Sequence, residues 1–128
     1  MIQASELRIG NKLNFLGDVV TFKNITEIRE DGIFWIKTFE PKIESKNFHF
    51  KPIEITENWL LIFGFKKRKN RHLFHWENKI VISEYKDEFE NFFYPKTGYD
   101  IRFSNEIKYV HQLQNLYFAL TGAELTVA

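Results

Sequence analysis

The hydrophobic residues of this chain recur with two different periods, and this change of period limits the folds that the chain can adopt. From Leu7 to Phe50, apolar residues are interleaved with polar ones in short segments that end at turn residues, as in an antiparallel sheet. In YVHQLQNLYFALTG, from Tyr109 to Gly122, apolar residues return every three or four positions, as on one side of a helix. The sequence therefore predicts an α+β fold.

The N-terminal segment is expected to form a small antiparallel sheet. The runs KLNFLG, VVTFKNITEIRE and IFWIKTF are separated at Gly17-Asp18 and Asp31-Gly32, and an Asp-Gly pair between apolar runs is typical of a hairpin. NFHF, residues 47–50, adds a fourth predicted strand. Because a flat sheet would leave its edges exposed, these strands should curl into a small barrel resembling the SH3 type. Residues 1–55 are thus predicted to be an SH3-like β lobe.

Residues 56–128 are predicted to be an α+β lobe that packs with the first lobe as one unit. Thr56 is expected to N-cap a helix over 57–63, which Gly64 ends. Since residues 59–63 are all apolar, this helix is predicted to be buried on every side, as the joint between the lobes. A second antiparallel sheet is expected from FKKRK, HLFHWE, KIVISEY, EFENFFYP and TGYDIRF, with the C-terminal helix packed on it.

Charge and cysteine content restrict the partners of the whole molecule. The 18 basic and 17 acidic residues leave a net charge of +1, so no overall field draws the protein to nucleic acid or to an anionic membrane. The absence of cysteine excludes a disulfide and a thiolate nucleophile, and it suits a reducing compartment. The start, MIQASELRIG, does not resemble a signal peptide, and no segment approaches the roughly 20 apolar residues of a membrane span. We therefore expect a cytoplasmic protein without a membrane partner.

The two sides of the C-terminal helix differ in character. The side predicted to face the core holds Tyr109, Val110, Leu113, Leu116, Tyr117 and Leu120. The other side is polar except for one large aromatic residue, and it holds His111, Gln114, Asn115 and Phe118. Phe118 could be covered by the tail AELTV, by the second sheet or by another protein molecule. His111, Gln114, Asn115 and Phe118 are therefore the candidate surface for a protein partner or for self-association, in a non-enzymatic binding module.

A basic run supplies the alternative function, nucleic-acid binding. KKRKNRH contributes Lys66, Lys67, Arg68, Lys69 and Arg71, and aromatic residues flank it on both sides. Basic groups neutralise phosphates while aromatic rings stack on unpaired bases. A hairpin tip is also polar in ordinary folds, and strand alternation would turn the aromatic rings toward the core. The run therefore favours either a nucleic-acid contact or a solvated hairpin.

No group of residues predicts a catalytic or metal site. His72 and His75 lie three positions apart, which on a strand sends them to opposite faces, and His49 is isolated. The sequence places no carboxylate beside His111, so chemistry there is not expected. Glu84, Asp87, Glu88 and Glu90 are interpreted as a solvated loop. We expect no enzyme activity, no cofactor and no bound metal.

Three segments together resemble a family of small uncharacterised proteins from Bacteroidetes genomes and their phages or integrated elements. They are ASELRIGN near the start, ITENWLLIFGF in the middle and IKYVHQLQNLYFALTGAEL at the end. The resemblance spans nearly the whole chain through these anchors. It implies a mobile-element origin, and it implies no activity, cofactor or site residue.

Overall fold

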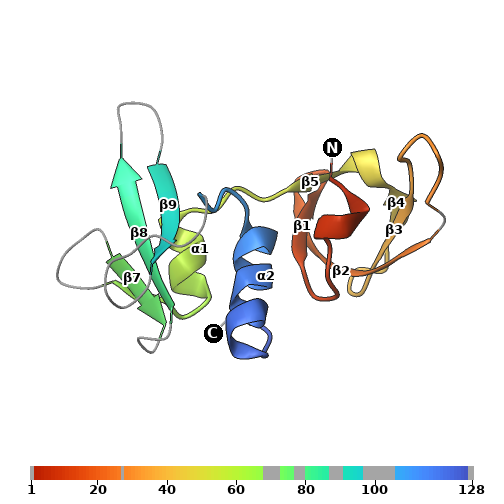
Figure 1. The fold of residues 1–128 in the computed structure, drawn as a ribbon. Coiled ribbons are helices and arrows are strands. Elements are labelled where there is room, and N and C mark those ends of the chain that lie inside the picture. The colour runs from red at the N-terminus through yellow and green to blue at the C-terminus, as the bar shows by residue number, and fades with distance from the viewer. Residues whose placement is uncertain are drawn as a thin grey trace.

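The protein is described by a computed structural model, which places residues 2–26, 28–67, 73–76, 80–86, 91–96 and 106–126. Figure 1 shows an N-terminal β lobe at one end, a second sheet at the other and the C-terminal helix α2, Val110–Thr121, between them. The predicted α+β class is confirmed. In the part of the chain that the structure describes, no helix is long and apolar enough to cross a membrane.

The N-terminal lobe is one antiparallel sheet of five strands. They are β1 (Lys12–Phe15), β2 (Asp18–Thr26), β3 (Trp35–Thr38), β4 (Glu44–Lys46) and β5 (Phe50–Pro52), in the order β4-β3-β2-β1-β5. The strands β4 and β5 lie at opposite edges, and no pairing between them closes the described strands into a barrel. The expected closed barrel is therefore not found.

The predicted strand at 47–50 is wrong, because Asn47–His49 is a 3-10 turn between β4 and β5. The Asn47 side chain is fully buried; its Oδ1 accepts from the backbone nitrogen of Phe34, and its Nδ2 donates to the carbonyl of Gly32 at 3.2 Å. These bonds bend the chain into the turn and satisfy backbone groups that a strand would have paired. One predicted strand is thereby replaced by two short ones on either side.

The hairpin between β1 and β2 turns through Leu16 and Gly17, one position earlier than expected. Both residues have positive φ, 51° and 95°. A two-residue turn of this kind matches the right-handed twist of the strands it joins. Behind the sheet lies an apolar cluster that contains Ile2, Leu13, Val20, Phe22, Phe34, Ile36 and Phe50.

The second sheet is also antiparallel, in the order β6-β7-β8-β9. Its strands are β6 (Lys66–Lys67), β7 (Leu73–Trp76), β8 (Ile80–Lys86) and β9 (Asn91–Lys96). The predicted strand at 97–103 and the predicted turns at 69–70 and 78–79 lie outside the described residues. The C-terminal helix and this sheet both contribute to a second apolar cluster, which includes Ile80, Ile82, Phe93, Val110, Leu113 and Tyr117. Leu120, which was expected in the core, is 52% exposed.

The short helix α1 (Glu57–Ile62) is not buried on every side, as its unbroken apolar run had suggested. Thr56 caps it as predicted, with its Oγ1 accepting from the backbone nitrogen of Trp59 at 3.3 Å. Leu60 is fully buried, whereas Leu61 is 46% exposed. A helix of six residues turns less than twice, so its neighbours cover only one side. It packs in the second apolar cluster, and α2 is the element of the second lobe that lies next to the N-terminal lobe.

The two apolar clusters are separate, and the chain that joins the lobes is held by backbone bonds to the start of α2. The nitrogen of Ile55 donates to the carbonyl of Lys108 at 2.8 Å. The nitrogen of Val110 donates to the carbonyl of Ile53, also at 2.8 Å. The connection between the lobes is thus fixed at the N-terminal end of α2.

Candidate functional site

The polar side of α2 faces the N-terminal lobe. Gln114 is 1% exposed, and both ends of its amide bond the backbone beside β1. Its Oε1 accepts from the nitrogen of Lys12 at 2.8 Å, and its Nε2 donates to the carbonyl of Gly10 at 3.1 Å. Because these backbone groups belong to the other lobe, Gln114 is a structural link between the lobes.

Asn115 makes a second link of the same kind. Its Oδ1 accepts from Asn11 Nδ2 and from Arg8 Nη1, both at 3.0 Å, and its Nδ2 donates to the carbonyl of Glu6 at 2.8 Å. All of these partners lie in the segment that precedes β1. Both ends of the amide are therefore bonded within the chain.

Arg8 covers Phe118. The guanidinium carbon of Arg8 lies 3.9 Å from the centre of the Phe118 ring, and Nη2 pairs with Glu124 in the C-terminal tail. Phe118 remains 40% exposed. The cover that the sequence left open is therefore supplied mainly by the N-terminal segment, through a cation–π contact.

The side of α2 formed by His111, Gln114, Asn115 and Phe118 is consequently not the open surface that the helical pattern had suggested. Three of its four residues are buried or bonded against the N-terminal lobe. The prediction that this side is free for a partner is wrong for those three. A helix wheel shows that a side is polar, but it cannot show that backbone groups of another lobe satisfy the polar atoms.

His111 is a buried titratable group at the same junction. It is 1% exposed, and neither ring nitrogen has a hydrogen-bond partner among the described residues. Its Nε2 lies 3.8 Å from Glu6 Oε2, a carboxylate that the sequence had not placed there. Burial lowers the pKa of His111, and the nearby Glu6 carboxylate opposes this shift only in part. His111 does not line either of the two hollows described below.

The basic run predicted for nucleic acid is described only at its start. Lys66 and Lys67 are exposed on β6, and the Lys67 ammonium lies 2.6 Å from Glu57 Oε1. Arg68, Lys69 and Arg71 lie outside the described residues. His72 also lies outside the described residues. The interpretation of Glu84 as part of a solvated loop is wrong, because Glu84 lies on β8 and is 2% exposed.

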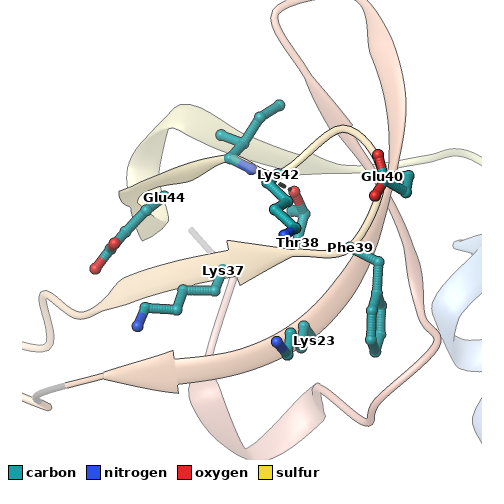
Figure 2. A pocket seen from close by; sticks show the side chains of 8 residues that line it. Lys23, Lys37, Thr38, Phe39, Glu40, Lys42 and Glu44 are labelled. Atoms are coloured by element: carbon teal, nitrogen blue, oxygen red, sulfur yellow. Dashed lines mark hydrogen bonds between the residues drawn. The ribbon is translucent and has the colours of Figure 1, made fainter.

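A pocket that the sequence did not predict lies on the N-terminal lobe, at the loop between β3 and β4. We call it the β3–β4 pocket; it has a volume of about 380 Å³ and is lined by Lys23, Lys37, Thr38, Phe39, Glu40, Lys42, Ile43 and Glu44. Figure 2 shows the lysine side chains in the middle of the group, with Glu40 and Glu44 toward its two ends. Phe39 is 41% exposed, and the Lys23 ammonium lies 5.7 Å from the centre of its ring.

The loop that carries this pocket is held from inside by one buried hydroxyl. Thr38 Oγ1 donates to the carbonyl of Pro41 at 2.5 Å and accepts from the nitrogen of Ile43 at 2.9 Å. The backbone of Phe39 is fixed as well, since its nitrogen donates to the carbonyl of Thr21 at 3.1 Å. Phe39 and Lys42 therefore project from a loop with a defined shape, which lowers the ordering cost of binding.

A second hollow lies next to the pocket and is mainly apolar. We call it the apolar hollow; it has a volume of about 530 Å³ and is lined by Ala4, Leu7, Arg8, Ile9, Phe22, Lys23, Asn24, Ile25 and Glu124. Ile9 is 64% exposed there. Lys23 lines both hollows, so they adjoin at this residue.

The sequence contained a weak signal for the β3–β4 pocket. Phe39 directly precedes Glu-Pro-Lys, and an aromatic residue at a polar turn is a candidate contact residue. The position of Lys23 could not have been read in this way, because it depends on a bulge in β2. In the described part of the chain, no three His, Asp or Glu residues gather where they could hold a metal ion.

Comparison of the chain with protein-family models, with curated proteins and with solved structures found no match. Functional assignment therefore depends on the geometry of the two hollows and of the lobe junction.

Proposed function

We propose that this protein is a non-enzymatic binding module that holds a segment of another protein in the β3–β4 pocket. The observation that carries the proposal is Phe39, a large aromatic side chain that stays 41% exposed on a loop fixed by Thr38. Aromatic side chains are enriched at protein interfaces and often anchor them. Lys23 and Lys42 line the same pocket.

The form of the lobe supports a binding role. We propose an SH3-like lobe because it has five short antiparallel strands, with a 3-10 turn between β4 and β5. Small β lobes of this type present their loops as recognition surfaces on a rigid sheet. A cytoplasmic location and a mobile-element origin belong to the same proposal, and their support is the sequence alone.

Nucleic-acid binding is the second candidate. Two lysine–aromatic pairs on the N-terminal lobe favour it: Lys23 with Phe39, and Lys46 with Phe48 at 5.8 Å. Residues 1–55, however, contain eight basic and eight acidic residues, and the pocket itself holds two glutamates. Because phosphate neutralisation supplies most of the affinity for nucleic acid, this balance favours a protein ligand. The run 66–71 stays the proposed contact for the nucleic-acid alternative.

The proposal is tested with a displayed library of random 12-residue peptides, selected on immobilised protein. Wild type and Phe48→Ser should enrich a common set of peptides, whereas Phe39→Ser should not. Phe48 is a matched control because it is 47% exposed on the same lobe but does not line the pocket. Failure of wild type to enrich any peptide, together with salt-sensitive binding of a 20-nucleotide single strand, would establish the nucleic-acid alternative instead.

Self-association is the other form of the proposed function, and Phe118 is its remaining exposed residue. The expected result for this form is a dimer of wild type in analytical ultracentrifugation and a monomer of Phe118→Ser. A monomeric mass for both proteins at micromolar concentration removes it.

A further inference from the structure

The two hollows of the N-terminal lobe adjoin at an irregularity in β2. The pairing of β2 with β3 shifts register between Phe22 and Asn24, so Lys23 is the extra residue of a bulge. A bulge bends its strand and redirects a side chain, and it is often found beside functional sites. Here it places Lys23 in the lining of both the β3–β4 pocket and the apolar hollow.

The two hollows differ in chemistry. The β3–β4 pocket offers three ammonium groups, from Lys23, Lys37 and Lys42, none of which forms an ion pair with a described residue. This is so even for Lys37, although Glu44 stands directly opposite it on β4. Ammonium groups around an exposed ring suit an acidic side chain, because the three lysines outnumber the two glutamates of the same pocket and none is within ion-pair distance of a described carboxylate.

The apolar hollow suits a large aliphatic or aromatic side chain. Its lining includes the buried Phe22 and also Ile9, which is mostly in solvent. Covering Ile9 would remove apolar surface from water, which is the main favourable contribution of such a contact. Arg8 and Glu124, which also line the hollow, pair with each other, so together they offer no net charge to a ligand.

We propose that the two hollows form one groove that binds an extended peptide segment with an acidic residue in the β3–β4 pocket and a large apolar residue in the apolar hollow. This inference rests on the proposed function and adds the class of ligand. Two glutamates in the pocket limit its excess charge to one unit, which favours a carboxylate over a polyphosphate chain. An extended peptide advances about 3.3 Å per residue, so a few residues are enough to reach from one hollow to the next.

The peptides selected by wild type provide the test. They should share an acidic residue and, a few positions away, a large apolar residue. One such peptide is then synthesised, and its affinity is measured by fluorescence polarisation against protein variants. Replacing its apolar residue by Ser should weaken binding about tenfold or more, as expected for the loss of one buried side chain.

Matched variants assign each half of the motif to its hollow. Ile9→Ser should weaken binding about tenfold, whereas Ile28→Ser, at a site that is 65% exposed and lines neither hollow, should leave it unchanged. Lys42→Glu should also weaken binding, and this loss should shrink when the acidic residue of the peptide is replaced by its amide. Lys51→Glu, at an exposed position of β5 outside both hollows, is the control for charge.

The outcomes separate this inference from the proposed function. If Phe39→Ser abolishes binding while Ile9→Ser and Ile28→Ser behave alike, the pocket binds peptides and the two-part groove is refuted. Selected peptides without an acidic residue refute the inference as well. If wild type selects no peptide, both proposals are refuted together.

Discussion

Replacing Gln114 by Met should destabilise the protein strongly, although the two side chains have similar size and flexibility. Gln114 is buried, and its amide satisfies the nitrogen of Lys12 and the carbonyl of Gly10. Met fills the same space but leaves both backbone groups without a partner. Each unsatisfied buried group costs about 1–3 kcal/mol, and the apolar thioether recovers part of this, so we expect a net loss of about 2–4 kcal/mol.

The loss is measured by urea unfolding, followed through the fluorescence of the three tryptophans. For a chain of this length, each kcal/mol corresponds to roughly 3–5 °C, so the melting temperature should fall by about 10 °C. Gln3→Met makes the same exchange at an exposed position and should change the free energy of unfolding by less than about 0.5 kcal/mol. A loss in Gln114→Met as small as that of the control would show that the amide is not a link between the lobes.

Three further perturbations test the junction, the helix end and the pocket loop. Because the unfolded chain binds a proton at His111 that the folded protein resists, the free energy of unfolding should fall as the pH drops below about 6.5. His111→Gln should reduce this pH dependence in urea titrations, and an unchanged dependence would contradict the reasoning. Gly122→Ala should lower the stability by about 1 kcal/mol in thermal melts, since Gly122 ends α2 at a φ of 73° with open space around it. Thr38→Val should weaken peptide binding several-fold without unfolding the lobe, because it frees the loop that presents the pocket; an unchanged affinity in fluorescence polarisation would refute this role.

The sequence predicts best those features that local rules control. Thr56 and Gly122 were identified as helix ends because capping chemistry depends on residues within one turn. The short period of the N-terminal runs predicted antiparallel strands, and the structure has them. The 3-10 turn at 47–49 was missed, since it depends on a side chain that reaches backbone groups far away in the sequence, at Gly32 and Phe34.

The polar side of α2 shows the limit of periodicity. The pattern correctly separated a side with Leu113 from a side with Gln114, but both side chains are buried. The apolar residues of α2 belong to the second apolar cluster, and its amides pair with groups of the first lobe. A polar helix side can therefore face either solvent or another lobe, because water and backbone groups both supply hydrogen-bond partners for its polar atoms. The sequence pattern alone could not distinguish these two cases.

The lobe junction and the proposed groove share Arg8, which connects binding to the docking of the lobes. Arg8 lines the apolar hollow, bonds Asn115 and Glu124, and covers Phe118. A ligand in the hollow would contact a residue whose position is fixed by α2 and the C-terminal tail. A ligand that binds only the form in which α2 contacts the N-terminal lobe stabilises that form. Peptide binding should therefore strengthen the contact between the lobes, and Arg8→Ala should weaken both this contact and the affinity for the peptide.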